Sequence, residues 1–198
     1  MRPHNPKSKE DILTIAIPLY ATSGYAGVSM RTIAKKVGVS AAALYHHFPD
    51  KQTLYLAAMT QTFADKAPSL EKILGGKAAP EQRLAKFITC LCVLVQQDND
   101  FSRLIQREMI DGDKSRLQLL ATEVYQRLFQ GVIGLCRELD AQHDPYLLAI
   151  SIIGLVMYHF QTATIRPYLP YSKEQHSDPH VVATHITQLI LQGLKPPI

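Results

Sequence analysis

Apolar residues recur at helical spacing along nearly the whole chain. Ile12, Ile15, Leu19 and their neighbours fall three or four positions apart, which places them on one face of an α-helix. Glycine, proline and N-capping residues such as Ser8 and Asp50 separate segments of this kind. The pattern predicts helices over about 8–24, 30–36, 41–47, 51–66, 80–97, 100–110, 114–141, 145–165 and 179–193.

No segment alternates between apolar and polar residues for long enough to predict a β-strand. Gly75 and Gly76 lie together in a polar stretch and indicate a boundary, because they carry no side chains that could pack. The sequence therefore predicts an all-α protein with a small N-terminal part and a larger C-terminal helical bundle. Pro18 falls inside the first helix, where we expect it to kink the helix without ending it.

Positive charge is concentrated at the N-terminal end. The net charge is +4, and residues 1–51, with seven basic and three acidic side chains, account for all of it. A local positive excess is expected of a module that binds a polyanion such as nucleic acid. A charge of this size also fits an ordinary solvated surface, so it does not decide between the two.

The composition is that of a globular protein, with 46% hydrophobic and 19% charged residues. Three cysteines and a polar first segment without a secretory apolar region favour a reduced, cytoplasmic location. No charge occurs between Asp144 and Arg166, but the strongly apolar part of this stretch, about 147–157, is too short to span a membrane. We therefore expect a buried helix and no membrane association.

Two short helices joined by a three-residue turn are predicted between Met30 and Pro49. Ala34 lets the helices approach where they cross, and Gly38 suits a turn that needs a positive φ. This spacing is that of a helix-turn-helix, whose second helix enters the major groove of DNA. The spacing alone equally allows a helical corner without a role in DNA binding. The inside of the corner is apolar, with Ile33, Val37, Val39 and Leu44.

The wider N-terminal sequence resembles the DNA-binding region of the TetR family of bacterial transcriptional repressors. The matching elements are GYAGVSMRTIA, then VGVSAAALYHHFPDK, then the start of the fourth helix. The resemblance implies a three-helix DNA-binding domain at 7–67, with its helix-turn-helix at about 30–49, and a helical ligand-binding and dimerisation domain at 77–195. It also implies a homodimer that binds a palindromic double-stranded DNA operator, represses transcription and responds to a small-molecule effector.

The resemblance further implies which residues contact DNA. The second helix touches the backbone at its start, the third helix faces bases and phosphates, and Lys51 clamps a phosphate. Tyr45 and His47 could instead pack against the corner. The implied DNA-binding residues are Ser29, Arg31, Thr32, Ser40, Ala41, Ala43, Tyr45, His46, His47 and Lys51.

The predicted recognition helix departs from what direct base readout favours. It carries three successive alanines and no Arg, Asn or Gln, the side chains whose paired hydrogen bonds discriminate best between bases. We therefore expect specificity from His46, from Ser40, from DNA shape, or from the arm before Ser8, which contains Arg2 and Lys7. That arm could equally be a disordered tail.

The C-terminal part contains candidates for two further roles. The uncharged helix over 145–165 is apolar nearly all round, as expected of a helix packed on two sides. Its small residues Ala149, Ser151, Gly154 and Ala163 would let a twin helix approach in a homodimer, although a central helix of a monomer is the alternative. Other side chains could line an effector pocket or could be satisfied core groups, namely Tyr125, Phe129, Tyr158, His159, Gln161 and Thr162.

No arrangement of residues points to a metal site, a cofactor or catalysis. Cys90 and Cys92 face nearly opposite sides of a helix, so we expect them, with Cys136, to be core thiols. Three histidines between 176 and 185 are divided by a helix cap. Because no phosphate loop or nucleophile motif occurs, we expect no enzymatic activity. The alternative to a DNA-binding regulator is a helical adaptor that keeps the corner but binds protein.

Overall fold

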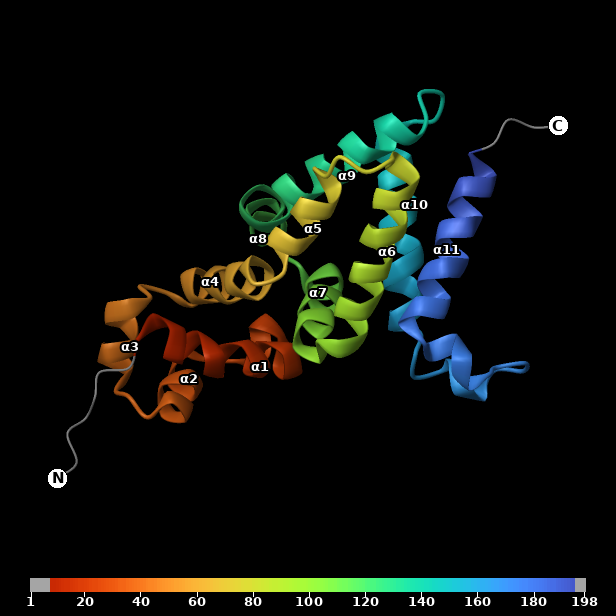
Figure 1. The fold of residues 1–198 in the computed structure, drawn as a ribbon. Coiled ribbons are helices and arrows are strands. Elements are labelled where there is room, and N and C mark those ends of the chain that lie inside the picture. The colour runs from red at the N-terminus through yellow and green to blue at the C-terminus, as the bar shows by residue number, and fades with distance from the viewer. Residues whose placement is uncertain (1–7, 195–198) are drawn as a thin grey trace. The chain divides into compact units, whose positions relative to one another are not determined.

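The computed structural model describes residues 8–194, and every regular element within them is helical (Figure 1). The arm that contains Arg2 and Lys7 lies outside the described residues. The expected all-α fold is confirmed. The elements are α1 (Lys9–Gly27), α2 (Met30–Val37), α3 (Ala41–His47), α4 (Lys51–Ala64), α5 (Ala67–Leu74), α6 (Pro80–Gln97), α7 (Asn99–Asp111), α8 (Lys114–Leu120), η1 (Ala121–Tyr125), α9 (Gln126–Leu139), α10 (Pro145–Gln161), η2 (Arg166–Tyr168), η3 (Glu174–Ser177) and α11 (Pro179–Gly193).

Side-chain caps start the predicted helices where the sequence places them. Ser8 forms a reciprocal capping box at α1, and Ser29 and Ser40 accept hydrogen bonds from the first turns of α2 and α3. Asp144 and Asp178 each cap a helix whose first residue is proline. These oxygens satisfy backbone N–H groups that have no partner within the helix, which explains why these helix starts could be predicted.

The structure differs from the predicted helices at several places. An additional helix, α5, follows α4 because Pro68 occupies the first turn of a new helix. A π-helical segment, η1, divides the single helix predicted over 114–141. The helix α10 ends at Gln161 and not near 165, and the Thr162 hydroxyl donates to the carbonyls of Tyr158 and His159 there. In α1 the helical angles continue through Pro18, and Gly24, with φ of 69°, is where they are broken.

The first of two compact units comprises the described residues up to Asp65 together with Asp100–Tyr125. Within it α1 packs on α4 and α2, α2 packs on α3, and α8 packs on α4 (Figure 1). The helices α7 and α8 therefore complete the core that this unit shares with the helix-turn-helix. The buried residues of this core include Ile12, Tyr20, Ile33, Leu44, Leu54, Tyr55, Leu104 and Leu120.

Arg107 on α7 stabilises the break in α1. The non-helical Gly24 interrupts the hydrogen-bond ladder, which frees carbonyls in the preceding turn. The Arg107 guanidinium donates to the carbonyl of Ala21 at 3.0 Å and also to that of Thr22. An arginine from a segment distant in sequence thus caps this part of α1.

The second compact unit comprises Lys66–Asn99 and the chain from Gln126 onward. Its central helix, α6, packs against α5, α9, α10 and α11. Buried Arg83 donates to the Leu74 carbonyl at 2.7 Å and pairs with Glu138, which ties α6 to the elements on either side. Cys92 and Cys136 lie in the core as expected, whereas Cys90 is half-buried. The predicted domain limits, 7–67 and 77–195, stay a prediction, and residues 100–125 group with the N-terminal helices by contact.

Gly38 provides a test of the turn between α2 and α3. Its φ is 81°, in the left-handed region, and a Cβ there would meet nothing within 4 Å. Gly38→Ala should therefore lower the free energy of unfolding by about 1 kcal/mol through backbone strain alone. Gly134→Ala is the control, because Gly134 is helical with open space around it, and alanine should raise stability by about 0.5–1 kcal/mol. Urea denaturation measures both, and an unaffected Gly38→Ala variant would contradict the account of the turn.

Candidate nucleic-acid interface

The turn between α2 and α3 is closed by backbone hydrogen bonds. The carbonyl of Ala34 accepts from the N–H groups of Gly38, at 2.9 Å, and Val39, at 3.0 Å. The Ser40 hydroxyl then accepts from the N–H of Ala43 at 3.1 Å and starts α3. Because each residue of the turn is hydrogen-bonded, the direction of α3 relative to α2 is fixed within this unit.

One side of α3 is buried and the other is free for a ligand. Leu44 is 0% exposed and anchors the helix in the core. Ala43, Tyr45 and His46 are exposed, with Tyr45 at 48%, while His47 is half-buried beside the His46 ring. Ala43, Tyr45 and His46 are therefore on the open side, whereas Ala41 and His47 are half-buried, and Tyr45 does not pack into the corner.

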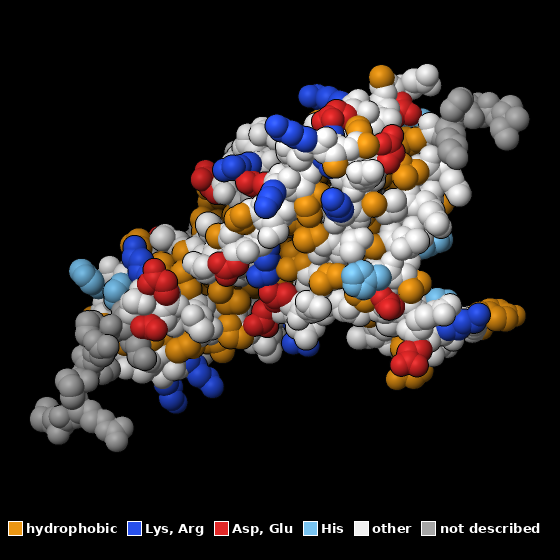
Figure 2. All heavy atoms as spheres, viewed as in Figure 1, with side chains coloured by type: hydrophobic (Ala, Val, Ile, Leu, Met, Phe, Trp, Pro, Cys, Tyr) orange, Lys and Arg blue, Asp and Glu red, His pale blue; other side chains and the backbone are white. Residues whose placement is uncertain are grey.

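The exposed part of α2 lies beside this face. Arg31 is exposed, and the hydroxyls of Ser29 and Thr32 are 2.8 Å apart. Lys35 and Lys36, in the last turn of α2, are also exposed, and they are not among the contacts predicted from the sequence. Figure 2 shows Lys and Arg side chains projecting over α2 and histidines over α3, with acidic side chains between them.

Lys51 begins α4 and is half-buried. Its Nζ lies 4.3 Å from the centre of the Tyr25 ring. Burial lowers the pKa of the Lys51 ammonium, and the nearby positive charge of Arg116 lowers it further. The neighbouring Asp50 carboxylate is committed to the N-cap of α4, where bonds from Thr53 lower its pKa.

The residues predicted to bind an effector fall in three places. Tyr125 packs on Phe63 in the first unit, with ring centres 5.0 Å apart, and burial raises the pKa of its hydroxyl. Phe129 packs on Tyr146 in the second unit. Three others, Tyr158, His159 and Thr162, line a surface hollow between α10 and α11, whereas Gln161 is exposed and is not part of its lining.

This hollow has a volume of about 1060 Å³ and is mainly apolar, with Leu155, Ile165 and Leu189 in its lining. His159 lies at its polar part, where its Nε2 is 3.0 Å from the His176 carbonyl oxygen. Burial lowers the pKa of His159. The hydrogen bond to the His176 carbonyl raises this pKa, whereas the charges of Arg166, His176 and His185 lower it further.

An apolar stripe runs along α10 and α11 on the side away from the core. Its large side chains on α10 recur at spacings of three and five residues, which keeps them on one helix face. Ala149 is 0% exposed and faces the core, so its predicted place among the residues approached by a twin helix is wrong. Ser151, Gly154 and Ala163 are exposed. The large side chains of the stripe are Leu147, Ile150, Leu155, Tyr158, Val181 and Leu189, each at least 37% exposed.

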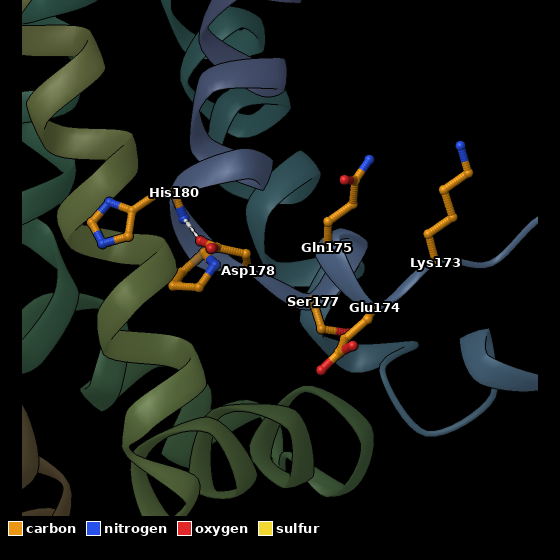
Figure 3. Close-up of a pocket in the computed structure, with 7 residues that line it drawn as sticks. Lys173, Glu174, Gln175, Ser177, Asp178 and His180 are labelled. Atoms are coloured by element: carbon orange, nitrogen blue, oxygen red, sulfur yellow. Dashed lines mark hydrogen bonds between the residues drawn. The ribbon is translucent and has the colours of Figure 1, made fainter.

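A second surface hollow is lined by residues of η3 and by the first residues of α11 (Figure 3). Asp178 is committed there to capping α11, since its carboxylate accepts from the His180 N–H at 2.8 Å. Lys173 and Gln175 extend away from that cap and do not converge with it. Among the side chains that the structure describes, no three from His, Cys, Asp or Glu are grouped to hold a metal ion. Within residues 8–194 no helix has the length and apolarity needed to cross a membrane.

Comparison with known proteins supports the N-terminal match and extends the fold to the whole chain. The profile of the family described as "Bacterial regulatory proteins, tetR family" matches residues 12–58. The chain is 25% identical over 132 residues to the nucleoid occlusion factor SlmA of Marinomonas sp. (strain MWYL1), covering 67% of each chain.

Two solved structures have the same fold. The transcriptional regulator FadR from Bacillus subtilis, in complex with stearoyl-CoA, gives a TM-score of 0.78 at 18% identity, over 95% of this chain and 100% of that one. AibR, in complex with isovaleryl coenzyme A and operator DNA, gives 0.69 at 21% identity, over 96% and 99%. Residues 12–58 therefore match the DNA-binding region of the tetR family of bacterial regulatory proteins, and the chain as a whole shares the fold of two solved regulators.

Proposed function

We propose that this protein is a dimeric, ligand-responsive repressor that binds a palindromic DNA operator through two copies of α3. The observation that carries the proposal is the open face of α3, which presents Tyr45 and His46 beside the exposed cations of α2. A rigid turn fixes the helix, as a recognition helix requires. Cations supply affinity for phosphate, while base-facing side chains supply specificity.

His46 is the polar side chain on this face that we assign to a base edge. Ala43 offers only a methyl group for contact with thymine. The imidazole of His46 is exposed and can donate or accept one hydrogen bond. Direct readout by so few groups implies that DNA shape contributes to selection at positions that the protein does not touch.

A selection experiment tests the DNA-binding function and its reader together. The full chain is mixed with DNA carrying randomised half-sites, and bound sequences are counted for the wild type and for His46→Ala. We expect the wild type to enrich a palindrome, and His46→Ala to lose discrimination by about 1–3 kcal/mol at the contacted position. His180→Ala, at an exposed histidine of the second unit, is the control and should select as the wild type does. Equal selection by His46→Ala would remove His46 as a reader.

The apolar stripe on α10 and α11 supports the homodimer. Apolar side chains at helical spacing on an outer face lose contact with water when a second helix covers them. A second copy of the chain presents the same stripe, so a dimer with two-fold symmetry can bury both stripes against each other. In this arrangement Tyr158, 68% exposed in the protomer, becomes an interface residue and not an effector ligand.

Gly154→Glu should split this dimer. A Cβ at Gly154 meets nothing within 4 Å in the protomer, so the substitution should leave the protomer folded and place a charge in the apolar stripe. Sedimentation should show a monomer for this variant. Gly134→Glu is the matched control, since it also adds a side chain at a helical glycine with open space, and it should stay dimeric. A dimeric Gly154→Glu variant would place the interface elsewhere.

Acyl-CoA thioesters are the effector class that we propose first. FadR and AibR, which share the fold, are described with stearoyl-CoA and isovaleryl coenzyme A. Effector coupling typically changes DNA affinity about 5- to 150-fold. Stearoyl-CoA and isovaleryl-CoA should each be added to the complex with the selected operator, with free CoA as control. Release by an acyl-CoA and not by CoA supports the class, while no change with either thioester contradicts it.

A second candidate function, nucleoid occlusion, is favoured by the similarity to SlmA. Both functions require DNA binding, so they differ in where the sites lie. Mapping the bound sites on the chromosome, with transcript levels in a deletion strain, separates them. A repressor has sites at promoters whose transcripts rise on deletion, whereas an occlusion factor has sites unconnected to such changes.

A further inference from the structure

A buried charged cluster lies in the first unit, outside the helix-turn-helix. Glu108 on α7 accepts from the Nε of Arg116 on α8 at 2.8 Å, and their side chains are 1% and 8% exposed. The hydroxyl of Tyr55 on α4 donates to the other oxygen of Glu108 at 2.7 Å. The carboxylate is therefore paired and hydrogen-bonded on both oxygens, and it holds the Arg116 guanidinium in one place.

The Arg116 guanidinium is directed at aromatic rings of α1 and α4. Its Cζ lies 4.3 Å from the centre of the Tyr25 ring and 5.7 Å from that of Tyr55. Tyr25 also meets Tyr55 edge-on, with ring centres 5.2 Å apart. Tyr25, in the last turn of α1, is thus fixed by contacts from both α4 and α8.

Tyr25 in turn contacts the cation that faces DNA in the proposed function. Lys51 Nζ lies 4.3 Å from the Tyr25 ring centre, so two cations flank one ring. Lys51 stands at the first position of α4, where the positive end of the helix dipole disfavours a cation. Among the described side chains no carboxylate forms an ion pair with Lys51. The described contact that holds its ammonium is therefore the ring.

We propose that Tyr25, held by the Glu108–Arg116 pair, is the positioning residue that presents Lys51 to an operator phosphate. The inference rests on the proposed DNA-binding function. The ring attracts the ammonium through its negative face, restricts a side chain that is otherwise flexible, and leaves N–H donors for the phosphate. Residues of α7 and α8, which lie outside the sequence motif, then set the strength of a DNA contact.

The DNA-binding test compares Tyr25→Leu, Tyr25→Phe and Lys51→Ala in the full dimeric chain, on the selected operator and on unrelated DNA. Tyr25→Leu removes the ring and should weaken binding to both DNAs about 2- to 30-fold. Tyr25→Phe keeps the ring and should bind within about twofold of the wild type. In a salt titration, Lys51→Ala should flatten the slope of log affinity against log salt by about 2 per dimer. The slope for Tyr25→Leu should lie between those of the wild type and Lys51→Ala.

A double variant separates positioning from a merely structural role. If Tyr25 acts through Lys51, Tyr25→Leu combined with Lys51→Ala should bind as Lys51→Ala alone does. Full additivity of the two losses would overturn the inference. So would a Tyr25→Leu variant that keeps the wild-type salt slope while Lys51→Ala loses it.

A measurement without DNA keeps the two proposals distinguishable. The side-chain methylene protons of Lys51 should show an upfield ring-current shift in the NMR spectrum of the wild type and of Tyr25→Phe. Its absence in the wild type would overturn the inference even if Tyr25→Leu fails to fold. If the shift is present and the wild type binds no DNA, the proposed function fails, and the phosphate role of Lys51 fails with it.

Discussion

The carboxylate of Glu108 connects helices that are far apart in the sequence. It pairs with Arg116 on α8 and accepts from Tyr55 on α4, and it is almost fully shielded from water. A buried charge of this kind is costly unless every bond is made, so the arrangement of α4, α7 and α8 around it is strongly restricted. Arg107, the residue before Glu108, caps the interrupted end of α1. The helices α1 and α4, which pack beside the helix-turn-helix, are thus held by a segment that the motif does not include.

The local features of the fold were predictable because they depend on near neighbours. Capping residues such as Ser40 and Asp178 act within one helical turn, and Gly38 adopts the left-handed conformation that a short turn needs. The additional helix α5 was not predicted, because Pro68 can either end a helix or begin one. The π-helical segment η1 has no comparable signal in the sequence.

The candidate site was predictable in part for the same reason. The open face of α3 follows from helical periodicity once Leu44 is assigned to the core. The part played by Tyr25 could not be predicted, since its contact with Lys51 joins residues that pack only after α1 and α4 come together. The predicted effector residues are spread over three places, because a ligand site depends on tertiary packing more than on residue type. Ala149 shows the same limit, as a small residue on an apolar helix fits either the core or an interface.

The central claim is that two copies of α3 read one operator from the two arms of a dimer. Hydroxyl-radical footprinting of the full chain on a DNA fragment recovered by its own binding tests this most directly. The account predicts two protected segments related by two-fold symmetry, with centres separated by about one helical turn, 34–36 Å, or a multiple of it. A single protected segment, or uniform weak protection along the fragment, would contradict the account.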